Sequence, residues 1–133
     1  YKIKNEEILS SSMEDYIEMI CRLSEKSDEV RVSELSSALN VQPPSTTKMI
    51  RRLAKENYVT YERYGFIKLT EKGREVGSKL LERHRIIFEF LECIGVKENI
   101  LEQTEIIEPA VNDEVLNKID ELTQFLKKCD KYK

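Results

Sequence analysis

Apolar residues recur every three or four positions along most of the chain, which is the spacing of helices that bury one face. The first such segment follows three serines, and its apolar positions are Met13, Ile17, Ile20 and Leu23. Because a serine hydroxyl caps a helix N-terminus, we expect Ser12 to begin this helix, which should end near residues 24–27.

The next two segments indicate short helices joined by a tight turn. Ser33 is the expected N-cap of the first helix, and Asn40 suits the left-handed conformation that ends it. Pro43 and Pro44 suit the first turn of the second helix, which should run to about Glu56. Two short helices in this arrangement predict a helix-turn-helix.

A β-hairpin is predicted directly after the second helix. Residues 58–62 and 66–69 are rich in β-branched and aromatic side chains, and residues 63–65 form a short connection that ends in glycine. A hairpin in this place is a wing. We therefore expect residues 1–72 to form a winged helix-turn-helix domain.

The rest of the chain predicts only helices. Thr70 suits the N-cap of one long helix over residues 72–93, which Gly95 would end. Residues 100–129 predict two further helices, interrupted around Pro109. The predicted fold is mainly α with a small β-hairpin.

The last of these helices has an apolar stripe with two interpretations. The stripe runs from Val115 to Leu126. It would serve either as a dimer interface or as core within the chain, because both need the same periodicity.

The net charge of −3 hides an uneven distribution of charge. Residues 41–85 carry 11 basic and 5 acidic side chains, residues 1–40 carry 5 and 9, and residues 86–133 carry 6 and 11. A local basic face is the electrostatic footprint of phosphate binding, whereas many charge runs only solvate a surface. Because the basic region coincides with the helix-turn-helix and the wing, we expect it to bind double-stranded DNA.

The second helix of the motif supplies the expected DNA contacts. A helix in the major groove presents its N-terminal side chains to base edges. The side chains in that position are Gln42, Pro44, Ser45, Thr47 and Lys48. Arg51, Arg52 and Lys55 follow them and should face phosphates, while Arg63 and Tyr64 at the wing tip should reach the backbone or the minor groove.

Composition disfavours several other classes of protein. No run approaches the about eighteen apolar residues of a membrane span, and the first twelve residues lack the apolar stretch of a signal peptide. The three widely separated cysteines are typical of reduced thiols. We therefore expect a cytoplasmic protein without a membrane partner. The chain has no glycine-rich loop and no nucleophile beside a base, so we predict neither an enzyme nor a small organic substrate.

Four motifs together resemble a known family. They are residues 13–18 (MEDYIE), 32–35 (VSEL), 44–49 (PSTTKM) and 69–73 (LTEKG). Nearly the whole chain resembles the metal-responsive repressors of the DtxR/MntR family, above all its short, manganese-sensing branch. The resemblance implies an N-terminal domain that binds an operator. It also implies that residues 73–133 form a helical metal-binding and dimerisation domain. The protein would then bind DNA as a homodimer, and the metal would fix the separation of its two DNA-reading helices.

The resemblance further implies a set of metal ligands. Asp15 and Glu18 match an aspartate and a glutamate of the first helix, and His84, the only histidine, matches one in the long helix. Glu105 and Glu108 match the glutamates of a later Glu-x-x-Glu-His stretch when a one-residue gap is allowed. Four carboxylates and one imidazole suit Mn²⁺ or Fe²⁺, so Mn²⁺ is the expected ion and other divalent metals are alternatives.

One position departs from the family pattern. Pro109 stands where the family has the histidine that helps bind a second metal. Two interpretations stay open: one metal is bound with altered affinity, or the site has degenerated and DNA binding is independent of metal. We expect a Mn²⁺-responsive repressor of metal-uptake genes. The alternatives from other classes are a winged-helix module that binds proteins and a small hydrolase that uses the same carboxylates around a metal.

Overall fold

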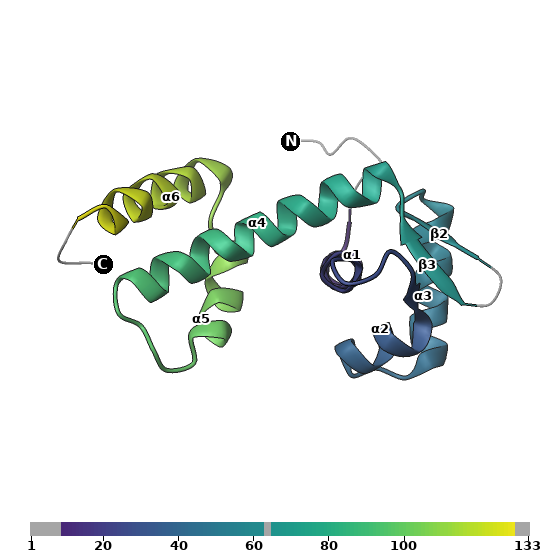
Figure 1. Ribbon diagram of the computed structural model, residues 1–133. Helices are drawn as coiled ribbons and strands as arrows, with labels where there is room; N and C mark the ends of the chain where they lie inside the picture. Colours follow the sequence, from purple (N-terminus) through teal and green to yellow (C-terminus); the bar gives the residue numbers. More distant parts are fainter. Residues whose placement is uncertain (1–8, 63–64, 130–133) are drawn as a thin grey trace. The chain divides into compact units, whose positions relative to one another are not determined.

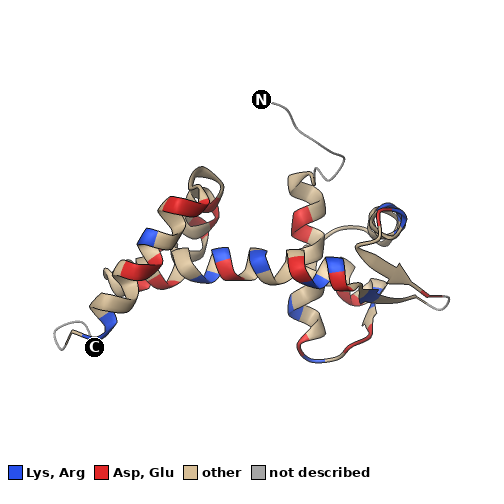
Figure 2. Ribbon diagram, turned by 90° about the horizontal axis from the view of Figure 1, so that it is seen from above, with Lys and Arg blue, Asp and Glu red and all other residues tan. Residues whose placement is uncertain are grey.

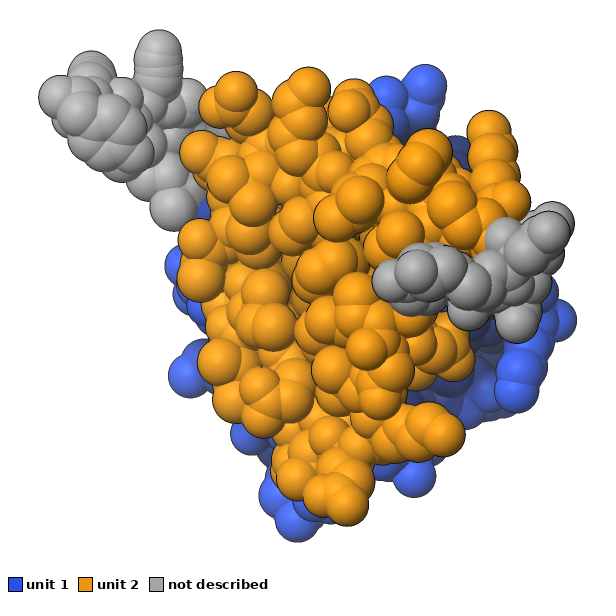
Figure 3. All heavy atoms as spheres, turned by 90° about the vertical axis from the view of Figure 1, so that its left-hand side faces the viewer, with its two compact units in different colours: residues 1–80 blue, residues 81–133 orange. Residues whose placement is uncertain are grey.

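The computed structural model describes residues 9–62 and 65–129 and forms two compact units. The first unit comprises residues 1–80 and the second residues 81–133, so the division falls inside one long helix (Figure 1). Figure 3 distinguishes the two units by colour. Among the described residues, no helix is long and apolar enough to cross a membrane.

The first unit is a helix-turn-helix followed by a hairpin. In chain order it contains α1 (Ser11–Ser24), β1 (Val30–Arg31), α2 (Val32–Leu39), α3 (Pro43–Lys55), β2 (Val59–Tyr61), β3 (Phe66–Leu69) and the beginning of α4 (Glu71–Cys93). Its core takes apolar side chains from the three helices and the sheet, among them Ile17, Ile20, Leu35, Ile50, Leu53 and Ile67. The predicted winged helix-turn-helix is confirmed.

The sheet has a third strand that the sequence pattern did not predict. β3 lies between β1 and β2 and is antiparallel to both, with Val30 opposite Ile67 and Val59 opposite Leu69. β1 contributes only two residues, which are too few to show an alternation of apolar and polar positions. Gly65 beside the wing tip has a φ of 85°, which glycine adopts without steric cost.

Two of the predicted N-caps are wrong by two residues. α1 begins after Ser10, whose Oγ accepts a hydrogen bond from a backbone N–H at 3.1 Å, so Ser12 lies inside the first turn. α2 begins after Arg31 rather than after Ser33, and the Glu34 carboxylate accepts the Arg31 backbone N–H at 2.8 Å. Because β1 pairs with β3, the backbone stays extended as far as Arg31, and this pairing sets the start of α2.

The turn between α2 and α3 has the predicted form. Asn40 is left-handed, with φ 57° and ψ 48°, and Pro43 begins α3. The two helices are also joined by a hydrogen bond that Ser36 Oγ donates to Thr46 Oγ1 at 2.8 Å, in a place where both side chains are buried. A buried hydroxyl costs free energy unless it finds a partner, so this pair favours one placement of α3 against α2.

α4 begins on the backbone that follows α3. Thr70 caps it as predicted, because its Oγ1 accepts the Gly73 N–H at 3.0 Å. Lys72 Nζ donates to the carbonyl of Glu56 at 3.1 Å. A Cβ atom on Gly73 would lie only 2.0 Å from the carbonyl oxygen of Tyr58. The start of α4 is therefore in direct contact with the end of α3.

Farther along, α4 packs closely against α1. A Cβ atom on Gly77 would lie 2.9 Å from Cβ and 3.0 Å from Sγ of Cys21. Burial, followed by the nearby charge of Glu25, raises the pKa of the Cys21 thiol. The absence of a side chain at position 77 lets the two helices approach to this distance.

The second unit is helical. It contains the rest of α4, then α5 (Ile100–Ile107), the short 3-10 helix η1 (Glu108–Ala110) and α6 (Asp113–Lys127). Gly95 follows α4 with a φ of 97°. The prediction of one long helix and two later helices, interrupted around Pro109, is confirmed. The core of the second unit is made by Ile86, Ile87, Leu91 and Leu116.

The apolar stripe of α6 divides between core and surface. Leu116 is buried, and Ile119 packs against the core. Val115, Leu122 and Phe125 are 44%, 48% and 63% exposed. Part of the stripe therefore serves as core within the unit, and the exposed part is left available for a dimer interface.

The close approach at Gly73 makes a stability prediction. Gly73→Ala should lower the free energy of unfolding by about 3 kcal/mol, because a carbonyl of the backbone cannot move aside cheaply. Chemical denaturation followed by circular dichroism measures this change. Ser78→Ala, at an exposed position of the same helix, is the control and should change it by less than about 0.5 kcal/mol. A loss of similar size in both variants would contradict the steric argument.

Candidate DNA-binding and metal-binding residues

α3 presents a basic face to solvent. It carries four basic and no acidic side chains, and Lys48, Arg51, Arg52 and Lys55 are all exposed. Spacings of three and four residues place them along one side of the helix. Within residues 9–62 and 65–129, no acidic side chain forms an ion pair with any of the four. Figure 2 shows α3 nearly end-on, with these residues in blue. Their charge is thus available to phosphate groups.

The opposite face of α3 holds the helix in place. Thr46, Ile50 and Leu53 are buried, at spacings of four and three residues. These residues set the rotation of α3 about its own axis, because turning the helix would expose them and break the bond from Ser36. The basic face therefore points away from the core.

The predicted base contacts lie at the N-terminal end of this exposed face. Gln42, Pro44 and Ser45 are exposed, and Thr47 is half-buried. Arg63 and Tyr64 fall outside the described residues. Contact of these residues with DNA bases stays a prediction. The structure places those that belong to α3 together on its surface, beside the basic side chains.

Two of the predicted metal ligands lie on α1. Asp15 is exposed and Glu18 is half-buried. Glu18 Oε2 accepts a hydrogen bond from Arg22 Nη2 at 2.9 Å. An ion pair of this kind on a helix surface contributes only about 0.3–0.5 kcal/mol. A divalent cation could displace Arg22 from Glu18 at that small cost.

His84 and Glu108 are in contact in the second unit. His84 Nδ1 lies 3.6 Å from Glu108 Oε1, and the two side chains are 17% and 16% exposed. The ring of Phe88, one turn later on α4, stacks on His84 with centroids 6.2 Å apart and an interplanar angle of 17°. An imidazole nitrogen and a carboxylate oxygen thus lie side by side in a mostly buried place.

The remaining positions complete the account of the predicted set. Glu105 is exposed on α5, three residues before Glu108, and Pro109 lies in η1. Asp15 and Glu18 belong to the first unit, whereas the three other predicted ligands belong to the second. Within either unit taken alone, and among the described residues, no three His, Cys, Asp or Glu side chains are grouped to hold a metal ion. The five-residue ligand set remains a prediction.

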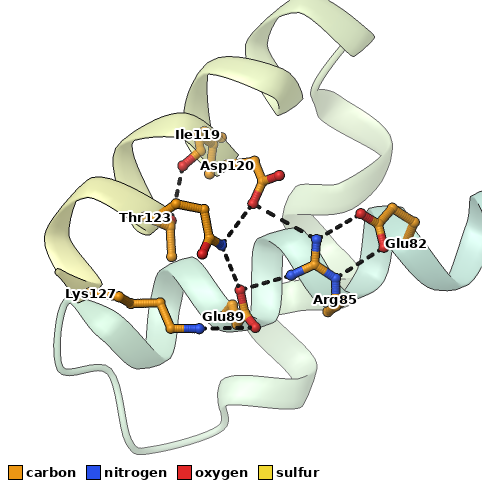
Figure 4. Close-up of polar contacts among 8 residues, drawn as sticks. Glu82, Arg85, Glu89, Ile119, Asp120, Thr123 and Lys127 are labelled. Carbon is orange, nitrogen blue, oxygen red and sulfur yellow. Dashed lines mark hydrogen bonds and ion pairs between the residues drawn. The ribbon is translucent and has the colours of Figure 1, made fainter. Parts of the chain in front are cut away.

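Arg85 connects α4 to α6 (Figure 4). Its guanidinium donates to Glu82 at 2.7 Å and to Glu89 at 2.8 Å on its own helix, and lies 3.8 Å from Asp120 on α6. Lys127 on α6 is 3.3 Å from Glu89. These charges form a network rather than isolated pairs, and it holds the two helices together beside His84.

The network changes the acidity of its members. The hydrogen bond from Arg85 holds the pKa of Glu82 below its usual value. Burial raises the pKa of Glu89, but hydrogen bonding to Lys127 and the charge of Arg85 outweigh burial, so that its pKa is lowered overall. Both carboxylates are therefore more stable in the charged form than they would be in an unfolded chain.

Sequence reasoning missed the two arginines that flank His84. Arg85 contacts α6, and Arg83 contacts the turn that holds Glu108, which lies 25 residues later in the chain. No local spacing indicates such contacts, because the partners include backbone carbonyl groups and side chains of other elements. Their position on both sides of the only histidine is the one signal that the sequence offers.

Comparison with known proteins gives the family. Residues 8–67 match the iron dependent repressor, N-terminal DNA binding domain, and residues 70–133 match the iron dependent repressor, metal binding and dimerisation domain. The chain belongs to the iron-dependent repressor family. The predicted class of protein, a regulator rather than a hydrolase, is thereby confirmed.

Relatives within this family cover most of the chain. The HTH-type transcriptional regulator MntR of Oceanobacillus iheyensis is 43% identical over 120 residues, which are 90% of this chain and 82% of the relative. The MntR regulator of Geobacillus kaustophilus is 41% identical over 121 residues, 90% of this chain and 86% of the relative. A solved manganese-dependent transcriptional repressor in complex with manganese is 26% identical, with a TM-score of 0.73 over 85% of this chain. This chain spans 53% of that longer chain.

The basic face of α3 predicts a salt-dependent effect on DNA binding. Arg51→Ala should weaken binding to all sequences alike and reduce the slope of log affinity against log salt by about 1, because one phosphate contact is lost. Fluorescence anisotropy at several salt concentrations measures the slope. Lys97→Ala removes an exposed lysine of the second unit and should leave it unchanged. A slope in Arg51→Ala equal to that of the parent protein would count against the contact.

The Arg85 network predicts a dependence of stability on pH. The lowered carboxyl pKa values mean that its stabilisation is present above the ordinary value of 4.5 and is lost as the pH falls below it. Arg85→Gln should therefore lower the melting temperature by about 2 °C near neutral pH and by much less in acid, since largely exposed pairs contribute below about 1 kcal/mol. Thermal unfolding across the pH range tests this. Lys79→Gln makes the same charge change at an exposed position of α4 and should show no such difference.

Proposed function

We propose that the protein is a Mn²⁺-responsive transcriptional repressor that binds a DNA operator as a homodimer and controls metal-uptake genes. Relatives named MntR and a neighbouring manganese-dependent repressor support this function. The observation that carries the metal response is the contact of His84 with Glu108 at 3.6 Å. Residues 1–72 would bind DNA, and residues 73–133 would bind metal and form the dimer.

The donor set fits a hard or borderline divalent cation. Asp15, Glu18, Glu105 and Glu108 supply carboxylate oxygens, and His84 supplies one imidazole nitrogen. Such a set suits Mn²⁺ or Fe²⁺ and lacks the thiolate that favours softer metals. A bound dication would supply positive charge that neutralises these carboxylates. His84 and Glu108 would hold it from α4 and η1, and Asp15 and Glu18 from α1.

The proposed response is a shift between geometries of the same protein. Metal binding can change DNA affinity only if the metal binds with different affinity to two geometries of the protein. A dimer on successive major grooves needs recognition helices about 34 Å apart. Favouring that separation in advance lowers the ordering cost of binding DNA.

Exposed apolar side chains of the second unit support the homodimer. They are Ile94, Leu101, Ile106, Val115, Leu122 and Phe125, each at least 44% exposed. A second copy of the chain that covered some of them would remove apolar area from water, which favours association. The family match to a dimerisation domain over residues 70–133 agrees with this use.

Pro109 favours a second candidate function. A proline ring has no nitrogen that can bind a metal, so one ligand of the family pattern is missing. If the remaining ligands do not suffice, the protein is a DNA-binding regulator that does not respond to metal. The same experiment separates the two functions.

Anisotropy of a labelled palindromic operator, with Mn²⁺ and then with chelator at fixed salt, is the test. Mn²⁺ should tighten binding about tenfold or more, within the usual range of coupling free energies. Glu108→Gln should lose most of this tightening, because it removes the carboxylate beside His84. Glu102→Gln, an exposed acidic position on α5, should keep it.

Each outcome has a distinct meaning. Equal binding of the parent protein with Mn²⁺ and with chelator would exclude the metal response and favour the second candidate. A full response in Glu108→Gln would exclude Glu108 as a ligand while leaving the metal response in place.

A further inference from the structure

Arg83 holds the turn that carries Glu108. Its Nη2 donates to the backbone carbonyl of Glu108 at 3.0 Å and to that of Val111 at 2.8 Å. Its Nη1 donates to Asp113 Oδ1 at 2.9 Å. One guanidinium of α4 therefore contacts the first residue of η1, the residue after η1 and the first residue of α6.

The chemistry of these contacts requires arginine. Carbonyl groups at a helix end have no partner inside the helix, and a planar guanidinium has enough fixed donors to satisfy several acceptors at once. The hydrogen bond within the turn is long, because the Val111 N–H donates to the Glu108 carbonyl at 3.4 Å. Arg83, which is 20% exposed, supplies the shorter bonds that hold this segment against α4.

The same contacts place the Glu108 side chain. His84 follows Arg83 directly on α4, and its Nδ1 lies 3.6 Å from the Glu108 carboxylate. Holding the Glu108 backbone against α4 therefore keeps its carboxylate within reach of His84, while Phe88, one turn later on α4, stacks on the imidazole.

We infer that Arg83 is a positioning residue for the metal site, which presents Glu108 to His84 without touching the ion. The inference rests on the proposed metal response and deepens it. Residues that orient metal ligands typically change affinity about 10- to 100-fold when they are replaced. The restraint matters more in this chain because Pro109 supplies no ligand of its own, so affinity depends on how well the remaining ligands are arranged beforehand.

Pro109 restrains the same turn in a second way. It lies in the first turn of η1, where its ring fixes φ near −65°. The turn is thus held from inside by the ring and from outside by Arg83. Although Pro109 supplies no ligand, it can thus still help to place the neighbouring Glu108.

The test compares Arg83→Gln with the parent protein and with two controls. Arg85→Gln removes an arginine of the same helix that contacts other carboxylates and α6. Asp113→Asn removes one charged partner of Arg83 but leaves both carbonyl contacts. Mn²⁺ affinity is measured by the electron paramagnetic resonance signal of free Mn²⁺. Amide hydrogen exchange at Val111 and Val115 is measured by NMR on the metal-free protein.

Arg83→Gln should raise the Mn²⁺ dissociation constant about tenfold and speed exchange at both amides, while operator affinity at saturating Mn²⁺ stays within about twofold of the parent. Arg85→Gln should leave the dissociation constant unchanged, and Asp113→Asn should raise it less than Arg83→Gln does. A general loss of stability would instead raise the Mn²⁺ dissociation constant in both arginine variants.

Three outcomes would overturn the inference. Unchanged exchange in Arg83→Gln would mean that Arg83 does not hold the turn, whatever the metal does. Faster exchange in Arg83→Gln with an unchanged Mn²⁺ dissociation constant would mean that holding the turn does not set the affinity for Mn²⁺. A dissociation constant that rises as much in Arg85→Gln as in Arg83→Gln would mean the same. Failure of the parent protein itself to bind Mn²⁺ would instead remove the proposed metal response, and this inference with it.

Discussion

The backbone between α3 and the wing is the constraint on which the first unit depends. The hydroxyl of Thr70 donates to the carbonyl of Asn57 at 2.6 Å, and Lys72 reaches that of Glu56. Gly73 lies so close to Tyr58 that no side chain fits there. The end of α3 and the start of α4 are therefore held together by direct contacts. α4 then runs on into the second unit, where it carries His84.

Local rules explain most of the fold that the sequence predicts. Asn40 and Pro43 have conformational preferences strong enough to define the turn of the helix-turn-helix, and the long apolar repeat of α4 leaves no other assignment. The errors occur where tertiary contacts decide. β1 exists because β3 is there to pair with it, and this pairing places the N-cap of α2 at Arg31 rather than at the predicted Ser33. The strand is too short to be recognised alone.

The candidate site divides in the same way. Surface exposure of the α3 side chains follows from helical spacing, so Lys48 and Arg51 could be predicted from the sequence. The neighbours of His84 could not be. Glu108 was proposed through a family resemblance, and its contact with His84 depends on an arginine that binds backbone carbonyl groups. Backbone acceptors have no sequence identity, which is why such a contact leaves no motif.

The contact between Gly77 and Cys21 has a mechanical consequence. With only hydrogen at position 77, α4 comes close to Cys21 and Ile17 on α1, so a side chain at this position would force the two helices apart. Within the first unit, α1 and the start of α4 are therefore held close together at this point. Asp15 and Glu18 lie on α1. Both carboxylates are therefore carried by a helix whose spacing from α4 is set at Gly77.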